Sequence, residues 1–270
     1  MQREWMEAQV ESLPAASNSI EIAIDLIARA RRAVALTGAG ISTPSGIPDF
    51  RSLDSGLWKR YNPMQVATLS AFRYRPEKFF EWLREVAAEV RMAQPNPAHI
   101  ALAQLEAAGY LAAIVTQNMD GLHQRGGARR VYEVHGTLNT VTCIRCYQQF
   151  SSEPFIKPFL QSGTIPQCPD CNGILKPDII LFEEQLPVKT WMNARAVCRE
   201  CDLMLVIGTS LEVMPVAGLP MQALEHNAPL ILINHSPTYL DVRAEVILRE
   251  NVAQVLPHIV QEVLARDPTQ

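Results

Sequence analysis

Residues 38–51 read G-A-G-I-S-T-P-S-G-I-P-D-F-R and follow a short apolar run at residues 33–36, which predicts a buried strand. Glycine directly after a strand lets the backbone approach a phosphate group and open into a helix whose N-terminus attracts anions. Only two glycines of the pattern G-x-G-x-x-G are present, because Thr43 occupies the third position. The segment is therefore either a tight turn between a strand and a helix or a loop that binds a phosphate.

The second half of this segment favours a binding loop. The prolines and the glycine of T-P-S-G-I-P exclude a regular helix. Asp49, Phe50 and Arg51 then add an acid, an aromatic ring and a cation. A stiff, proline-rich loop that carries these three groups is typical of a lid over a ligand, and we interpret the segment in this way.

Composition sets broad limits on the function. A chain of 270 residues can form one or two domains with a sizeable core. A net charge of -4 and a pI of about 5.9 argue against a general nucleic-acid binder and suit a protein that receives basic substrates. We see no membrane-spanning run, secretory signal or transit peptide, so a cytoplasmic location is expected. In that compartment the six cysteines are more often metal ligands or free thiols than disulfides.

Strands and helices are predicted to alternate along most of the chain. Near-continuous apolar runs are typical of parallel strands that are covered on both faces. The predicted strands are residues 33–36, 111–116, 131–134, 203–207, 230–233 and 246–248, and the predicted helices are residues 20–30, 76–92, 97–108 and 252–265. Between residues 138 and 177 the apolar content falls and four cysteines cluster. The pattern predicts an open α/β sheet with an inserted small module.

The inserted module carries two C-x-x-C pairs. The predicted ligands are Cys143, Cys146, Cys168 and Cys171. Four thiolates close the coordination shell of a tetrahedral ion, which is typical of a structural zinc site; redox-active or unpaired thiols are the alternative. A third pair, Cys198 and Cys201, has no partner pair, and we interpret its members as core or free thiols, with redox chemistry as the alternative.

Polar residues follow most of the predicted strands at their carboxyl ends. They are Gln117, Asn118 and Asp120 after the second strand, His135 after the third, and Gly208, Thr209, Ser210 and Asn234 after the next two. Taken singly, each is more often a helix cap, a turn former or a surface residue. Ligands of open α/β sheets bind outside these strand ends, however, so the whole set predicts a dinucleotide-binding crevice.

The motifs of this chain occur in an order and spacing that resemble the sirtuin family. They are G-A-G-I-S-x-x-S-G-I-P-D-F-R, T-Q-N-x-D-x-L-H, H-G, the two cysteine pairs, G-T-S and the strand end at Asn234. Sirtuins are NAD-dependent protein-lysine deacylases, and the resemblance covers residues 20–264. It implies a Rossmann-like parallel sheet with helices on both faces, formed by residues 1–51, 97–138 and 177–270. A small domain would combine a helical module at residues 52–96 with a zinc ribbon at residues 139–176. NAD and an acyl-lysine peptide would meet in the cleft between the domains.

The resemblance also implies a role for each site residue. His135 would be the general base, and Asn118 a second catalytic residue that also holds the nicotinamide end. The other cofactor-binding residues would be Gly38, Ala39, Gly40 and Ser42 at the pyrophosphate; Asp49, Phe50 and Arg51 in the loop over the reactive ribose; Gln117 at the ribose; Asp120 at the carboxamide; Gly208, Thr209 and Ser210 at phosphate or adenosine ribose; Asn234 at that ribose; and Val252 at the adenine. Ile179, Ile180 and Phe182 would bind the acyl-lysine substrate.

The implied reaction consumes NAD. The acyl oxygen would attack the ribose as nicotinamide leaves, and His135 would deprotonate a ribose hydroxyl on the way to 2′-O-acyl-ADP-ribose and free lysine. The single zinc ion would be structural.

Some positions depart from the usual sirtuin pattern. Glu183 stands where F-G-E has glycine, which could crowd or recharge the peptide groove. Leu83 and Val86 align with the Tyr-x-x-Arg pair of desuccinylating sirtuins, which favours neutral acyl groups such as acetyl.

Three functions remain open at this point. The favoured function is an NAD-dependent lysine deacetylase that acts on acetyl-lysine proteins or peptides, with no direct nucleic-acid binding and no membrane partner. A sirtuin-fold ADP-ribosyltransferase or NAD glycohydrolase would use the same site on another acceptor. A non-catalytic NAD-binding or zinc scaffold is the third, and the presence of both His135 and Asn118 argues against it. A dehydrogenase is disfavoured, because Thr43 breaks the glycine pattern and no acid is evident at the end of a following strand to bind an adenosine ribose.

Overall fold

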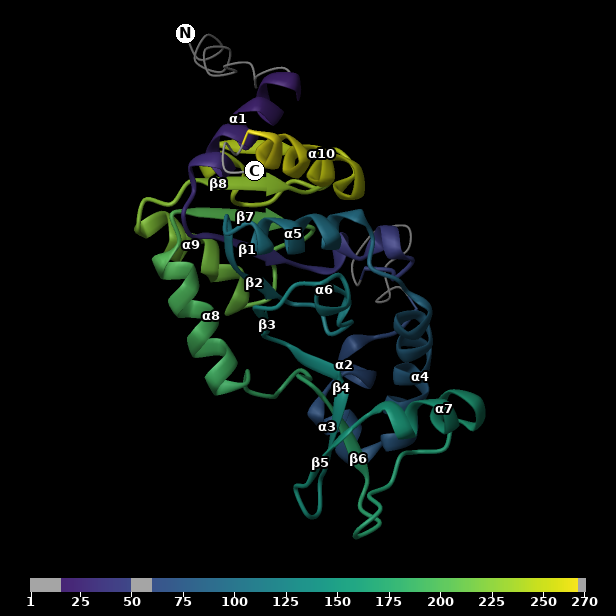
Figure 1. Cartoon of the computed structure of the whole chain (residues 1–270). Coiled ribbons are helices and arrows are strands. Elements are labelled where there is room, and N and C mark those ends of the chain that lie inside the picture. The colour runs from purple at the N-terminus through teal and green to yellow at the C-terminus, as the bar shows by residue number, and fades with distance from the viewer. Residues whose placement is uncertain (1–15, 50–59, 267–270) are drawn as a thin grey trace, which may run out of the picture.

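The structure is a computed structural model that describes residues 16–49 and 60–266 (Figure 1). The larger part is a six-stranded parallel sheet with the order β3-β2-β1-β7-β8-β9. Its strands are β1 (Ala33–Thr37), β2 (Leu111–Thr116), β3 (Val131–Glu133), β7 (Leu203–Ile207), β8 (Leu230–Ile233) and β9 (Val246–Leu248). The strand order reverses between β1 and β7, which is where open α/β sheets bind their ligands.

The register places the carboxyl ends of all six strands at one level. Thr37, the last residue of β1, pairs with Thr116 of β2 on one side and with Ile207 of β7 on the other. The further end pairs are Thr116 with Glu133, Ile207 with Ile233, and Ile233 with Leu248. The loops that follow the strands therefore leave the sheet along a single edge.

Helices cover both faces of this sheet (Figure 1). One core contains α1 (Ala16–Arg29), α5 (Pro97–Ala107) and α10 (Val252–Ala265), and the other contains α8 (Val188–Glu200) and α9 (Leu219–Glu225). Alternate residues of β1 point to opposite faces, so Ala33 and Ala35 lie in the first core while Val34 and Leu36 lie in the second. This arrangement confirms the predicted α/β class.

The elements of the large sheet agree closely with the prediction. The strands predicted at residues 111–116, 203–207, 230–233 and 246–248 and the helices predicted at residues 76–92 and 252–265 have the observed bounds. Strand β1 includes Thr37 as well, β3 ends one residue early, α5 ends at Ala107, and α1 begins at Ala16. Among the described helices, none is both long enough and apolar enough to cross a membrane.

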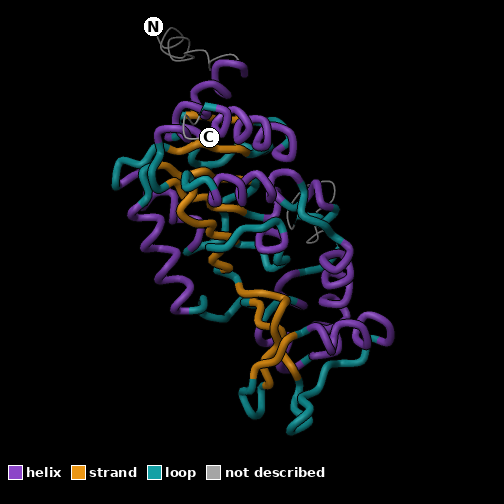
Figure 2. The backbone as a smooth tube through the Cα atoms, in the orientation of Figure 1, coloured by secondary structure: helices purple, strands orange, loops and turns teal. Residues whose placement is uncertain are grey.

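The smaller part of the molecule combines a second sheet with a group of helices. The antiparallel sheet has the order β5-β4-β6, with β4 (Gly136–Cys143), β5 (Gln149–Ser151) and β6 (Leu175–Ile179). Figure 2 shows these strands continuing away from the parallel sheet toward the far end of the molecule. The accompanying helices are α2 (Pro63–Val66), α3 (Leu69–Tyr74), α4 (Pro76–Met92) and α7 (Glu153–Ser162). Strands β4 and β6 run across the boundaries predicted at residues 138/139 and 176/177, and the domain division stays a prediction.

Aromatic side chains hold the helices of the smaller part together. The ring of Phe79 on α4 is fully buried and lies edge-on to Phe72 and Phe80, with centroids 5.2 and 5.1 Å apart. Phe80 contacts Phe159 of α7 in the same way at 5.8 Å. Because Ile179 and Leu181 belong to the same core, the helices and the second sheet pack as one body.

We predict that Phe79→Ala lowers the free energy of unfolding by about 3–5 kcal/mol, because the deletion leaves a cavity among closely packed rings. Urea unfolding would measure this loss. Tyr74→Ala is the control: Tyr74 is 81 % exposed, and its loss should change stability by less than about 0.5 kcal/mol. Equal effects of the two substitutions would contradict the packing described here.

Candidate active site and metal centre

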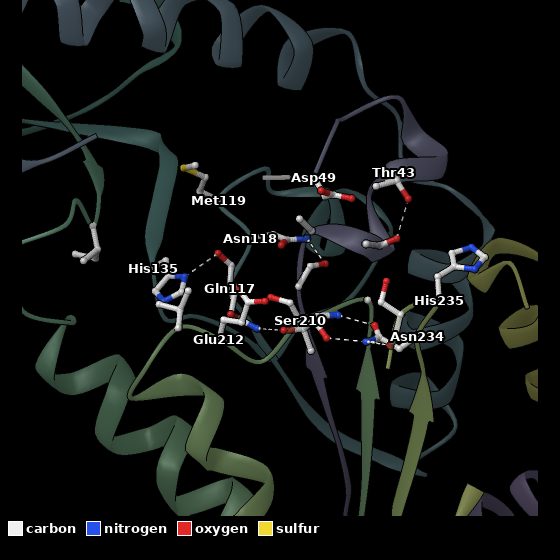
Figure 3. Close-up of a pocket in the computed structure, with 18 of the residues that line it drawn as sticks. Thr43, Asp49, Gln117, Asn118, Met119, His135, Ser210, Glu212, Asn234 and His235 are labelled. Carbon is white, nitrogen blue, oxygen red and sulfur yellow. Dashed lines mark hydrogen bonds between the residues drawn. The ribbon is translucent and has the colours of Figure 1, made fainter. Parts of the chain in front are cut away.

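A cleft of about 870 Å³ lies where the strand-end loops of the large sheet meet the segment after β6 (Figure 3). It is lined by most of the predicted site residues, namely Gly38, Ala39, Gly40, Asp49, Gln117, Asn118, His135, Ile179, Ile180, Phe182, Gly208, Thr209, Ser210, Asn234 and Val252. Ser42 and Asp120 do not belong to this lining and lie behind Asn118. Phe50 and Arg51 lie outside the described residues.

The first glycine loop packs against the loop after β7. The N–H of Gly40 donates to Gly208 O at 2.8 Å. A Cβ atom at Gly38 would lie 2.8 Å from Gly208 O, and one at Gly40 would lie 2.7 Å from Gly208 Cα. Gly208 itself has a φ of +59°, in the left-handed region that favours glycine. Contact between the two loops is therefore a reason for these glycines that does not depend on any bound phosphate.

His135 lies at the cleft wall with its ring orientation fixed. Its Nδ1 is 3.2 Å from Gln117 O (Figure 3). A carbonyl oxygen only accepts, so Nδ1 carries the proton and Nε2 is the basic atom of the neutral ring. The N–H of Ile180 donates to His135 O at 2.8 Å, which ties the backbone of this residue to the predicted substrate segment. This geometry suits a general base.

Asn118 links the loops that follow β1 and β2. Its Nδ2 donates to Gly38 O and to Ser42 Oγ, each at 3.1 Å. Because Gly38 O can only accept, the amide nitrogen faces it and the orientation of the side chain is determined. Oδ1 is then the atom of Asn118 that can accept a hydrogen bond from a bound hydroxyl.

Ser42 and Asp120 form a buried pair behind Asn118. The Ser42 hydroxyl donates to Asp120 Oδ2 at 2.7 Å, and the N–H of Leu122 donates to Asp120 Oδ1 at 2.9 Å. His99 on α5 lies with Nε2 3.4 Å from Ser42 Oγ. Since the N–H of Asn96 donates to His99 Nδ1, the ring proton of His99 is on Nε2 and points to Ser42. The predicted contact of Asp120 with the carboxamide stays a prediction.

Asn234 stabilises a loop instead of pointing freely into the cleft. Its Oδ1 accepts from the N–H of Thr209 at 2.8 Å, and its Nδ2 donates to Thr209 O at 2.7 Å. Gln117 Nε2 donates to Thr209 Oγ1 at 2.9 Å. Thr209 is thus held from two neighbouring loops, and Ser210 is the exposed hydroxyl of the G-T-S turn. Val252 is the first residue of α10 and lies at the edge of the cleft.

The predicted substrate segment continues from the end of β6. Phe182 is 39 % exposed in the cleft, and its backbone bonds to Ala67 and Leu69 at 3.0 Å each. Leu83 and Val86, predicted to face the acyl group, are buried in the core of the smaller part and do not line this cleft. Their neighbour Trp82 lines it instead, and the preference for neutral acyl groups stays a prediction.

Glu183 has a φ of +74°, the left-handed backbone that the usual glycine would adopt without strain. Its carboxylate Oε2 accepts from the N–H and the hydroxyl of Ser70, at 2.9 and 2.7 Å. These hydrogen bonds lower the pKa of Glu183, so the group is a carboxylate near neutral pH. Glu183 lines the cleft and is also bound to the start of α3, which the sequence pattern did not predict.

Other residues of the cleft were not predicted. Met119, Glu212 and His235 line it together with Trp82. They come from turns and loops without an apolar period, and Trp82 comes from the middle of a helix, so no local pattern marks them. Their common property is that each lies within a few residues of a predicted one.

The four predicted zinc ligands come together at the tip of the smaller sheet. Their Sγ atoms all lie within 4.8 Å of one another, with Cys143 3.4 Å from Cys171 and Cys146 3.7 Å from Cys168. A tetrahedral zinc ion with Zn–S bonds of about 2.3 Å requires sulfurs about 3.8 Å apart. Tyr147 and Asn172, each one residue after a C-x-x-C pair, have left-handed backbones that complete two similar turns. The thiolates therefore fit one structural zinc.

Cys198 and Cys201 are buried at the end of α8, away from this cluster. Burial raises the pKa of the Cys198 thiol, and it raises that of Cys201 to about 12. Since the thiolate is the reactive form, both residues are inert core thiols, as the sequence predicts.

We predict that metal analysis finds one zinc ion per chain. Cys143→Ser should abolish stoichiometric zinc and lower the midpoint of thermal unfolding, because the ion connects both turns of the module. Cys198→Ser should leave the zinc content unchanged. A wild-type protein without zinc, or a Cys143→Ser variant that keeps it, would contradict the assignment.

We predict that two buried histidines make the fold sensitive to acid. Burial lowers the pKa of His99 to about 4, although the nearby Asp120 acts in the opposite direction; burial also lowers the pKa of His123 to about 3. Both values lie below the ordinary value of about 6.5, so the unfolded chain binds more protons below that pH and stability falls as the pH drops from 6.5 toward 4. The loss should approach about 1.4 kcal/mol per pH unit for each histidine.

Chemical unfolding between pH 7 and pH 4.5 would measure this slope. His123→Asn should make the slope shallower, whereas replacement of the exposed His226 by Gln should leave it as in the wild type. An unchanged slope in His123→Asn would show that this histidine is not held neutral by the fold.

Comparison with known proteins agrees with this architecture. A model of the Sir2 family matches residues 38–215. The chain is 41 % identical to an NAD-dependent protein deacylase of Archaeoglobus fulgidus, over 91 % of this chain and 96 % of that protein. It is 40 % identical to an NAD-dependent protein deacetylase of Geobacillus kaustophilus, over 90 % of this chain and 98 % of that protein.

A solved complex of a Sir2 protein with a p53 peptide and NAD⁺ has the same fold. It superposes with a TM-score of 0.82 at 37 % identity, and the match covers 90 % of this chain and 98 % of the other. With the family match, the two relatives and this complex in agreement, the chain belongs to the Sir2 family.

Proposed function

We propose that this protein is an NAD-dependent protein-lysine deacetylase that transfers the acetyl group to ADP-ribose and releases nicotinamide. The observation that carries the proposal is the position of His135, whose ring is fixed through Nδ1 and which shares one cleft with Asn118, the glycine loop and the substrate segment. Relatives at 38–42 % identity are NAD-dependent deacetylases or deacylases.

NAD, when bound, supplies the ribose carbon that becomes electrophilic as nicotinamide departs and that receives the acyl oxygen. The loops after β1 and β7 would hold the phosphates of NAD through Gly38, Gly40 and Ser210, which line the cleft. Asn118 Oδ1 would accept a hydrogen bond from the ribose, since its Nδ2 is used by Gly38 and Ser42. Gln117 would contact the ribose, and Thr209, Asn234 and Val252 would shape the adenosine side. Asp49 would belong to the loop that keeps water from the site, and the roles proposed for Phe50 and Arg51 in that loop concern residues outside the described part of the chain.

His135 acts as the base in the second stage. Nδ1 keeps its proton because it donates to Gln117 O, so the incoming proton from a ribose hydroxyl binds at Nε2. The resulting imidazolium is stabilised by the carbonyl of Gln117. Ile179, Ile180 and Phe182 hold the acyl-lysine beside this ring. An imidazole suits this step because its ordinary pKa lies near neutrality.

The remaining proposals follow from the same site. The substrates are acetyl-lysine proteins or peptides, and the acidic chain has no direct affinity for nucleic acids. The zinc ion supports the smaller part, which forms one wall of the cleft together with the core around Phe79. Residues 1–51, 97–138 and 177–270 form the NAD-binding domain, and residues 52–96 and 139–176 form the small domain. The free thiols of Cys198 and Cys201 suit a reducing cytoplasm.

We predict that mass spectrometry of an acetyl-lysine peptide shows loss of the acetyl group only when NAD is present, with one nicotinamide released per acetyl lost. His135→Ala should lower kcat by about 10²- to 10⁴-fold, as expected for the loss of a general base. His226→Ala, which removes an exposed histidine that does not line the cleft, should have wild-type activity.

The same measurement separates the alternatives. Nicotinamide release while the acetyl group stays on the peptide would favour an ADP-ribosyltransferase or NAD glycohydrolase. Absence of both products would favour a non-catalytic scaffold and would end the enzyme proposal.

A further inference from the structure

A row of buried polar side chains lies beneath the strand ends, and the proposed roles do not use it. It consists of Thr37 at the end of β1, Thr116 at the end of β2 and His123 on the short helix α6 (Leu122–Arg125), with exposures of 0, 2 and 1 %. His123 Nε2 is 2.9 Å from Thr37 Oγ1, and the Thr37 hydroxyl donates to Thr116 Oγ1 at 2.8 Å. We refer to these three residues as the hydroxyl chain.

The hydroxyl chain is not explained by stability alone. Thr37 and Thr116 are paired neighbours on adjacent central strands and follow the apolar runs A-V-A-L and L-A-A-I-V. Valine has the same shape as threonine and would fill these positions without burying a hydroxyl, which costs free energy unless it is hydrogen-bonded. Among the described residues, Nδ1 of His123 has no hydrogen-bond partner, which adds a further cost.

The upper end of the hydroxyl chain holds the backbone of the predicted catalytic loop. Thr116 Oγ1 accepts from the N–H of Asn118 at 3.1 Å, and Thr37 O accepts from the N–H of Gln117 at 3.0 Å. Gln117 O in turn accepts from His135 Nδ1. The backbone N–H groups of Gln117 and Asn118 are therefore both held by the ends of β1 and β2. The predicted base, His135, is hydrogen-bonded to the same segment through Gln117 O.

His123, at the lower end of the hydroxyl chain, is also connected to the loop that carries Asn118. The ring of His123 lies edge-on to His99, with centroids 4.9 Å apart. His99 contacts Ser42 Oγ, which accepts from Asn118 Nδ2. The contacts thus form a closed ring that holds Asn118 at its backbone N–H and at its side-chain amide.

We propose that Thr37, Thr116 and His123 are positioning residues, which fix Asn118 directly and His135 through Gln117 without touching NAD or peptide. This inference rests on the proposed function. The Thr116 hydroxyl matters most, because it is the acceptor for the Asn118 N–H. Its loss should leave that N–H unpaired and allow the loop to move, which affects turnover more than the binding of the peptide.

The first test measures the position of the loop and does not depend on activity. Thr116→Val keeps the shape of the side chain and removes the acceptor, whereas Thr116→Ser keeps the hydroxyl. Hydrogen exchange followed by NMR should show the Asn118 amide exchanging about tenfold faster or more in Thr116→Val than in the wild type. It should be near the wild-type rate in Thr116→Ser, with the Val206 amide of β7 unchanged in both as internal reference. An Asn118 amide with equal protection in all three proteins would overturn the proposal.

The second test measures kcat and KM for an acetyl-lysine peptide at saturating NAD. Thr116→Val should lower kcat about tenfold or more while the KM for the peptide stays within about twofold, and Thr116→Ser should restore most of the rate. Val263→Ala, a cavity variant in the fully buried face of α10, controls for lost stability and should keep the wild-type kcat.

The outcomes of the two tests are distinct. Faster exchange with an unchanged kcat in Thr116→Val would overturn the positioning role, as would an equal loss of kcat in Val263→Ala. A wild-type protein without deacetylation would overturn the proposed function and the kinetic role with it, while the exchange measurement would still decide whether the hydroxyl chain anchors Asn118.

Discussion

The common level of the six strand ends is the constraint that organises this molecule. Parallel pairing from β3 to β9 ends on neighbouring residues, so each following loop starts at the same height above the sheet. A slip of one residue would turn every side chain of a strand to the opposite face. The two apolar cores on either side prevent such a slip, because both faces of each central strand are already filled. The packing of the two cores therefore also determines where the loops of the site begin.

A second body supplies the wall that faces these loops. Its strands are only partly buried, so an aromatic core and a cluster of four thiolates take the place of the fully buried apolar strands of the large sheet. The backbone connects the two bodies at the site itself, since His135 follows β3 and the next residue begins β4. The hydrogen bond from the Ile180 N–H to His135 O is a second connection between the two bodies. The predicted base thus belongs to both bodies, and neither can move without affecting it.

Most of the large sheet could be predicted from the sequence, because strands that are buried on both faces form uninterrupted apolar runs. The smaller sheet could not, since β5 and the start of β4 are half-exposed and are held by pairing and by the cysteine cluster. The predicted site residues mostly line one cleft, as parallel strand ends require. Sequence spacing does not say which way a side chain turns, however. Ser42 and Asp120 face inward, and Asn234 bonds Thr209 of the neighbouring loop. His99 gave no local signal, and His123 belongs to the T-Q-N-x-D-x-L-H motif but was given no role.

The contact between Gly38, Gly40 and Gly208 has a consequence for how this site can change over evolutionary time. A Cβ atom on any of the three would clash with backbone atoms of the opposite loop. A second substitution changes a side chain and cannot remove backbone atoms. No compensating mutation is therefore within reach, unlike in a side-chain core, where a larger residue can be offset by a smaller neighbour. Divergence among descendants of this chain should consequently be directed to the peptide-facing side, where the left-handed backbone of Glu183 is accompanied by hydrogen bonds from its side chain to Ser70.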